Sequence, residues 1–263
     1  LWNSDKINTV SIVTRHDAHA QQVINALNSG KNVFVEKPLA LTLTELEEID
    51  KSYHKANKLS VVRLMVGFNR RYASHVVKMK KLLESHRSPK SIIMTINAGA
   101  ISGEHWVQDT LIGGGRIVGE GCHFIDLMRH LVGHSIIGFT AMKIGSGPGV
   151  EIREDKASMT LSFEDGSFGT IHYLANGGSR FPKERIEVFC DNAVLQMDNY
   201  RVLTGFGWPG FKKMKLFKQD KGQKACAKAF IESIANGKEC PIPYSEVMES
   251  SKASIEIANL LRN

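Results

Sequence analysis

A lysine and a proline end a short apolar run early in this chain of 263 residues. Residues 32–40 read NVFVEKPLA, and the alternating apolar side chains at their start predict a buried strand. Pro38 fixes its own backbone φ and disfavours the helical region for Lys37, so the chain stays extended through the lysine. Because ligands of open α/β sheets bind at the C-terminal ends of strands, an ammonium group there could donate a proton or anchor a substrate. The alternative is a solvent-exposed lysine after a strand, which is the commoner use of a lone Lys-Pro pair.

A second group of polar residues follows three consecutive glycines. Residues 113–131 read GGGRIVGEGCHFIDLMRHL, in which the apolar residues recur at helical spacing. Glu120, His123 and Asp126 are three residues apart and would lie near one line on such a helix. A carboxylate one turn from a histidine can orient its ring and raise its basicity, which suits acid–base catalysis. The alternative is a capped helix with a salt-bridging histidine, and the glycines either let a ligand approach closely or form a flexible turn.

The segments that position Lys37 alternate between strand and helix. Thr44 and Glu47 form a predicted capping box at the start of one helix, and Gly30 suits the left-handed position that ends another. The alternation predicts parallel βαβ units. Apolar periodicity places the strands at residues 7–14, 32–36 and 59–66 and the helices at 18–29 and 44–56.

Strands dominate the chain after residue 67. The turn signals Glu164-Asp165-Gly166 and Cys190-Asp191-Asn192 each separate two neighbouring strands, so an antiparallel sheet is predicted. The predicted strands are 91–98, 136–143, 157–163, 167–174, 184–189, 193–198, 200–206 and 214–217, and the predicted helices are 72–84, 221–236 and 245–261.

The composition narrows the class of partner. The chain has a formal charge of +7, but its basic residues are dispersed, and the densest group, Lys78, Lys80 and Lys81, reads as the solvated face of a helix. An anionic small molecule or cofactor therefore explains the charge better than nucleic acid does. The four cysteines include no Cys-x-x-Cys pair, which predicts a reducing, cytoplasmic location and no structural zinc. No apolar run approaches the roughly 20 residues that span a bilayer.

Four segments carry a resemblance to a known family. They are residues 14–19 (TRHDAH), 33–40 (VFVEKPLA), 67–71 (GFNRR) and 113–127, the glycine–histidine stretch. In this order and at this separation, they resemble the Gfo/Idh/MocA oxidoreductases, the glucose-fructose oxidoreductase and inositol dehydrogenase superfamily. His105-Trp106 and residues 181–185 (FPKER) further resemble a subgroup often fused behind a zinc-type alcohol dehydrogenase domain.

The resemblance implies an α/β plus α+β fold. The C-terminal half of a Rossmann domain would occupy residues 1–67, and an open, mostly antiparallel β-sheet domain with covering helices would occupy 68–263. An enzyme of this kind uses NAD or NADP to transfer a hydride to or from a sugar-like or polyol substrate. Relatives often form homo-oligomers, so a dimer or tetramer is expected, in which the alternating residues Ile171, Tyr173 and Phe189 could bury the free face of the sheet.

The resemblance also implies roles for individual residues. Lys37 would contact the substrate hydroxyl, and His123 would be the general acid/base, with Glu120 beside it as a further catalytic residue. The cofactor side and the cleft entrance would be formed by Thr14, Arg15, His16, His19, Glu36, Lys37, Pro38, Asn69 and Arg70.

Two departures set the chain apart from the family's pattern. Gly119 stands where the family usually has an aspartate, four residues before the histidine, and the adjacent Glu120 could substitute for it. The glycine-rich turn that holds the pyrophosphate is absent before the first predicted strand, so Leu1 is expected to lie about halfway through the Rossmann domain of a longer protein. Both departures keep an alternative function open: a scaffold of the same fold that binds a sugar or nucleotide without turnover.

Overall fold

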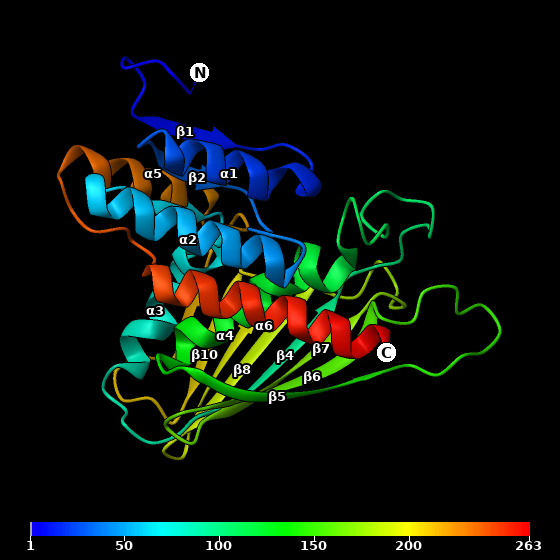
Figure 1. Cartoon of the computed structure of the whole chain (residues 1–263). Helices are drawn as coiled ribbons and strands as arrows, with labels where there is room; N and C mark the ends of the chain where they lie inside the picture. The colour runs from blue at the N-terminus through cyan, green and yellow to red at the C-terminus, as the bar shows by residue number, and fades with distance from the viewer. Residues whose placement is uncertain (1) are drawn as a thin grey trace. The chain divides into compact units, whose positions relative to one another are not determined.

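The computed structural model describes residues 2–263 and is drawn in Figure 1. Its contacts divide the chain into two compact units, and neither unit is one continuous stretch. The first contains the residues up to Phe68 together with 104–126 and 224–256, and the second contains 69–103, 127–223 and 257–263. Residues far apart in the sequence therefore build each unit.

A three-stranded parallel sheet forms the centre of the first unit, in the order β1-β2-β3. Helix α1 follows β1 after a short 3-10 turn at His16–Ala18, and α2 joins β2 to β3. The two helices pack against each other. The predicted parallel βαβ units are therefore confirmed. The elements are β1 (Thr9–Ile12), α1 (His19–Asn28), β2 (Asn32–Val35), α2 (Leu43–Leu59) and β3 (Leu64–Val66).

The N-cap of α2 is Thr42, two residues before the predicted cap Thr44, so the helix begins at Leu43. The Thr42 hydroxyl accepts the backbone N–H of Glu45 at 3.1 Å, and the Glu45 carboxylate accepts the N–H of Thr42 at 3.1 Å. Both threonines have a glutamate three residues on, so the capping box alone does not decide between them. A hydrophobic staple decides in favour of Thr42. Leu41 directly precedes this cap, Leu46 is the fourth residue of the helix, and both side chains are buried.

The helix predicted through residues 113–131 is irregular at its start. A π-helical turn occupies Ile117–Gly121, and the regular helix α4 spans only Cys122–Val132. Such a turn inserts an extra residue and rotates the side chains before it relative to those after it. The predicted helix is therefore present but contains a π-helical turn, and Glu120 lies in that turn and not in α4. Two further helices, α5 (Gln223–Ala235) and α6 (Tyr244–Arg262), confirm the predicted C-terminal pair.

An eight-stranded sheet forms the centre of the second unit (Figure 1). Its order is β11-β10-β9-β8-β4-β7-β6-β5, and every pair is antiparallel except β4–β7. The predicted, mostly antiparallel sheet is thus confirmed. Its elements are α3 (Ser74–Leu83), β4 (Ser91–Asn97), β5 (Ile136–Lys143), β6 (Lys156–Phe163), β7 (Phe168–Leu174), β8 (Glu184–Cys190), β9 (Ala193–Asp198), β10 (Val202–Phe206) and β11 (Lys213–Lys215), with the short 3-10 turn Asn69–Tyr72 before α3.

The two faces of this sheet differ in chemistry. One face is apolar and buried, and Ile171 and Tyr173 lie on it with no exposed surface. The other face is rich in half-buried serine and threonine, and Thr160 and Thr170 hydrogen-bond across it at 2.9 Å. The expectation that Ile171 and Tyr173 form an oligomer contact is therefore wrong, since strand alternation turns them into the core. Phe189 lies on the opposite face and is 39% exposed.

None of the helices within residues 2–263 is long and apolar enough to cross a membrane. Over the same residues, no three histidine, cysteine, aspartate or glutamate side chains are grouped so that they could hold a metal ion.

Candidate active site

Backbone pairing fixes the position of Lys37 at the carboxyl end of the parallel sheet. The ladder continues one residue beyond β2, where the Glu36 N–H donates to Ile12 O at 2.9 Å. The Gly67 N–H likewise donates to Val35 O at 2.8 Å. A Cβ on Gly67 would lie 3.1 Å from both oxygens of the Glu36 carboxylate, so the glycine leaves room for that group. Lys37 is the first residue beyond this edge.

The ammonium group of Lys37 reaches the glycine-rich segment. Its Nζ donates a hydrogen bond to Gly119 O at 2.8 Å, and the side chain is half-buried. An ammonium group carries three N–H donors. Within residues 2–263, Nζ makes no second hydrogen bond, so two donors stay available to oxygen atoms of a ligand. This is the geometry that a substrate-anchoring lysine requires.

The imidazole of His16 is buried beside the same segment. Its Nδ1 lies 2.8 Å from Gly113 O, and the indole of Trp106 meets the ring edge-on at 4.8 Å between centroids. Burial lowers the pKa of His16 to about 4; the charge of Lys37 acts in the same direction, and the bond to Gly113 opposes it. The ring is therefore neutral at physiological pH.

His19 is fully buried and joins the ends of two strands. Its Nδ1 lies 2.7 Å from Pro38 O, and its Nε2 lies 3.1 Å from Thr14 O. Since carbonyl oxygens only accept, the ring nitrogen that carries the hydrogen is the donor, and a neutral ring donates in one of the two contacts. His19 thus braces the segments after β1 and β2, and its two polar atoms face the protein's own backbone.

Replacing His19 with leucine is expected to lower the free energy of unfolding by about 1–3 kcal/mol, because a buried hydrogen bond between the ring and a backbone carbonyl group is lost. Urea denaturation followed by circular dichroism measures the loss. His54→Leu is the matched control, since the His54 side chain is 63% exposed. A loss no larger than that of the control would contradict the bracing role of His19.

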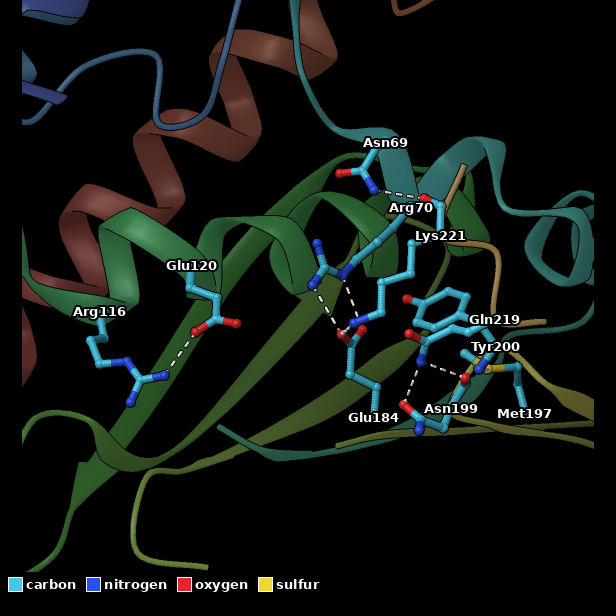
Figure 2. A network of polar contacts seen from close by, with 10 residues as sticks. All are labelled: Asn69, Arg70, Arg116, Glu120, Glu184, Met197, Asn199, Tyr200, Gln219 and Lys221. Carbon is cyan, nitrogen blue, oxygen red and sulfur yellow. Dashed lines mark hydrogen bonds and ion pairs between the residues drawn. The ribbon is translucent and has the colours of Figure 1, made fainter. Parts of the chain in front are cut away.

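Glu120 and His123 lie on either side of the junction between the π-helical turn and α4. The Glu120 carboxylate accepts a hydrogen bond from Arg116 Nη2 at 2.9 Å (Figure 2). His123 is buried, and its ring meets Phe68 edge-on at 6.2 Å between centroids. Arg116 is thus a partner of Glu120 that the sequence did not suggest, and the catalytic role of the two predicted residues stays a prediction.

Asn69 and Arg70 belong to the second unit, where their side chains hold other residues (Figure 2). Asn69 Nδ2 donates to Lys221 O at 2.6 Å. Arg70 donates two hydrogen bonds of 3.0 Å to the fully buried carboxylate of Glu184, and Lys221 Nζ donates to the same carboxylate at 2.6 Å. Sequence reasoning missed this network, because its members are far apart in the chain.

Thr14 and Arg15 lie at the exposed carboxyl edge of the parallel sheet. The Arg15 guanidinium lies 5.7 Å from the centre of the Trp106 ring, the same ring that contacts His16. In the sequence, Trp106 stood out only as part of a subgroup signature. Its packing against Arg15 and His16 was not predicted.

The polar groups at this edge fit the nicotinamide end of a dinucleotide. They comprise the two available donors of Lys37, the neutral ring of His16, and the exposed side chains of Thr14 and Arg15. Sugar hydroxyls and a carboxamide need such a mixture of donors and acceptors. The pyrophosphate would need a glycine-rich turn before a helix, which the described residues do not place at this edge.

Two protein-family descriptions match the chain and define the class of protein to which it belongs. A family described as "Oxidoreductase family, NAD-binding Rossmann fold" matches residues 1–68, so the chain contains the NAD-binding domain of an oxidoreductase. A second, described as "GFO/IDH/MocA C-terminal domain", matches residues 76–196. The chain belongs to the Gfo/Idh/MocA family, as its motifs suggested.

Individual relatives agree with this assignment. The chain is 26% identical over 211 residues to myo-inositol 2-dehydrogenase of Thermotoga maritima, an alignment that covers 78% of this chain and 60% of that protein. It thus spans about three fifths of the length of such curated relatives. Among solved structures, an oxidoreductase domain protein of Kribbella flavida matches with a TM-score of 0.84 at 21% identity, covering 100% of this chain and 81% of that one. A levoglucosan dehydrogenase in complex with NADH and levoglucosan matches with a TM-score of 0.80 at 22% identity, covering 98% and 80%.

Proposed function

We propose that the protein transfers a hydride between NAD(P) and the hydroxyl-bearing carbon of a polyol or sugar-like substrate. The observation that carries the proposal is the Lys37 ammonium, fixed on Gly119 O at the edge of an NAD-binding sheet with two donors to spare. Relatives named as inositol dehydrogenases, and the neighbour named levoglucosan dehydrogenase, support a substrate with several hydroxyl groups.

In this mechanism Lys37 binds the oxygen at the reacting carbon. Its charge stabilises the partial negative charge that develops on this oxygen as the proton leaves the hydroxyl. His123 takes that proton during oxidation and returns it during reduction, the role that the family resemblance gives it. The bound nicotinamide supplies the hydride acceptor or donor. Thr14, Arg15 and His16 would hold the nicotinamide and ribose at the edge of the sheet.

The protein expressed from its complete coding sequence tests the proposal. Absorbance of the reduced nicotinamide is followed with NAD⁺ or NADP⁺ against a panel of polyols and sugars that includes myo-inositol. Turnover with at least one alcohol is expected. If reduced cofactor binds but no alcohol or ketone exchanges a hydride, the proposal is wrong.

A second candidate function is a scaffold that binds a sugar or nucleotide without turnover. Gly119 favours it, since a glycine provides no carboxylate four residues before His123. Transfer of deuterium from a labelled polyol to the oxidised cofactor separates the two candidates, because a scaffold transfers none.

We also infer that the protein is a homo-oligomer whose subunits meet across the exposed face of the eight-stranded sheet. Register places Phe168, Phe189 and Phe206 in one row across this face, and they are 49%, 39% and 54% exposed. Exposed aromatic side chains gathered in this way mark interaction surfaces.

Replacing Phe189 with lysine is expected to convert the oligomer into monomers, because it would bury a charge at the interface without a partner. Size-exclusion chromatography with light scattering measures the change. Leu59→Lys, an equally apolar exposed position in the first unit, is the control and should leave the mass unchanged. A monomeric wild-type protein would contradict the inference.

A further inference from the structure

The His16 ring touches both ends of the segment that runs from Gly113 to Gly119. Its Nδ1 lies 2.8 Å from Gly113 O. At the other end, a Cβ built on Gly119 would lie 3.1 Å from the ring carbon Cε1 and 3.5 Å from Nδ1. A separation of 3.1 Å is tighter than ordinary van der Waals contact, and close-packed interiors respond to the addition of a single carbon. The ring therefore fills the space that a side chain at residue 119 would need.

This ring has little freedom to move away from Gly119. It belongs to a residue that is only 7% exposed, and the Trp106 indole meets it edge-on at 4.8 Å between centroids. The next residue along the chain is bound to the same segment, because the Asp17 N–H donates to Ile112 O at 3.1 Å. A carbon added at residue 119 would thus meet a ring that is held on several sides.

The carbonyl group of Gly119 connects the ring to Lys37. The Lys37 Nζ donates a hydrogen bond to Gly119 O at 2.8 Å, so the position of the ammonium follows the position of this peptide. The imidazole of His16 can lie near that charge because burial lowers its pKa to about 4 and keeps it neutral. If the ring cannot yield to a side chain at residue 119, the peptide must shift instead and carry the hydrogen bond of Lys37 with it.

We propose that His16 is a positioning residue for Lys37: its buried ring fixes the peptide of Gly119, whose carbonyl oxygen holds the ammonium. The ring acts by packing and needs no contact with the substrate. The inference rests on the proposed function only for the part that Lys37 plays in hydride transfer. It also accounts for the glycine at residue 119, where the family usually has an aspartate, because an aspartate side chain would need the space that the ring occupies.

Four variants test this role in the protein expressed from its complete coding sequence. Gly119→Ala adds the carbon for which the ring leaves no room, His16→Ala removes the ring, and a double variant combines the two. Gly121→Ala is the matched control: this glycine is buried in the same π-helical turn, and the nearest atoms to its Cβ would be those of the Ile117 side chain, at 3.4 Å or more. Thermal denaturation shows which variants are folded, and Gly119→Ala keeps the test usable if His16→Ala is not.

Competitive acetylation measures the Lys37 amine without substrate or turnover. Each protein is treated with a trace of acetic anhydride, and mass spectrometry gives the rate of labelling at Lys37 relative to the exposed Lys55. This relative rate should rise about fivefold in Gly119→Ala and in His16→Ala, because the amine no longer has to break its hydrogen bond to Gly119 O before it reacts. It should stay unchanged in Gly121→Ala. The double variant should match His16→Ala, since the added carbon then meets no ring.

Steady-state kinetics relates the position of Lys37 to the reaction. A displacement of a few tenths of an ångström is expected to lower kcat of Gly119→Ala about tenfold, because hydride transfer depends on exact placement of the groups that bind the reacting oxygen. The KM for NAD(P) should stay near that of the wild type, and Gly121→Ala should change neither constant. A raised KM for NAD(P) with unchanged kcat would mean that His16 and Gly119 act on the cofactor, and the inference would be wrong.

Two labelling results would overturn the inference as well. One is a wild-type rate at Lys37 in folded Gly119→Ala or His16→Ala. The other is a double variant in which Gly119→Ala raises the rate as much as it does alone, because crowding against the ring could then not be the cause. Altered labelling of Lys37 in a protein that exchanges hydride with no alcohol would sustain the positioning role of His16 and refute the proposed function instead.

Discussion

Replacing Lys37 with methionine is expected to lower kcat/KM for hydride transfer by about 10³-fold, within the range for loss of one donor aimed at a developing negative charge. Methionine keeps the length and the apolar stem but has no donor for the substrate oxygen. The fold should survive, since Gly119 O loses one half-buried hydrogen bond worth about 1 kcal/mol. Steady-state kinetics with NAD(P) and the preferred alcohol measures the loss.

Two further variants make the Lys37 experiment more specific. Lys37→Arg keeps the positive charge, but a planar guanidinium cannot direct N–H groups of one nitrogen at both Gly119 O and a substrate oxygen as an ammonium does, so little activity should return. Lys55→Met removes an exposed lysine of α2 and should leave kcat/KM unchanged. Turnover of Lys37→Met within a few-fold of the wild type would remove Lys37 from the mechanism.

Elements bounded by local signals could be predicted from the sequence. The hairpin between β8 and β9 was found because Asp191 and Asn192 tolerate the left-handed backbone conformation, and both adopt it, with φ of 47° and 61°. The start of α2 was missed, although the staple of Leu41 and Leu46 was visible in the sequence. Turns and helix caps can be predicted from the sequence because the residues that form them are neighbours in the chain.

The site was predictable in its residue types and not in its contacts. The sequence pointed to Lys37 and His16, but their partners are the backbone carbonyl oxygens of Gly119 and Gly113, which any residue possesses. The π-helical turn before α4 gave no periodic signal either, since the apolar residues keep nearly helical spacing across it. Contacts between segments some 80 to 100 residues apart depend on packing that a single sequence does not display.

Arg70 shows how a sequence motif can point to a residue without revealing the partner of its side chain, and its predicted role at the cleft entrance stays a prediction. Its neighbours Gly67 and Asn69 match the family's motif, which suggested the cleft entrance. The structure gives its guanidinium a bidentate bond to Glu184, 114 residues away. Glu184 itself could have indicated this pair. It begins a strand predicted to be buried, and a buried carboxylate is almost always paired with a positively charged side chain.

The carboxylate of Glu184 holds the buried network of the second unit together (Figure 2). It has no exposed surface and receives hydrogen bonds from Arg70 and Lys221. The Lys221 ammonium also lies 5.7 Å from the centre of the Tyr200 ring, whose phenol is fully buried. Burial raises the pKa of the Tyr200 hydroxyl well above its ordinary value, and the charge of Glu184 adds to the rise.

Replacing Glu184 with glutamine is expected to lower the free energy of unfolding by about 3–5 kcal/mol, because two buried cations lose their counter-charge while the shape is kept. Urea denaturation at pH 7 measures the loss. Glu187→Gln is the control on the same strand: its ion pair with Arg185 is partly exposed, so under about 1 kcal/mol is expected. Adding Lys221→Met to Glu184→Gln should recover part of the loss, since one uncompensated charge then disappears.

The dependence on pH provides an independent check of the same prediction. Burial by itself would raise the pKa of Glu184, but the charges and hydrogen bonds of Arg70 and Lys221 outweigh it and hold the pKa below its ordinary value. A carboxyl group with a lowered pKa contributes stability that is present above its unfolded pKa and is lost as the pH falls through the folded value. The difference in unfolding free energy between the wild type and Glu184→Gln should therefore be constant from pH 8 to about 5 and narrow at more acidic pH. A difference that stays constant at acidic pH would mean that Glu184 stabilises the unit through its shape and not through its charge.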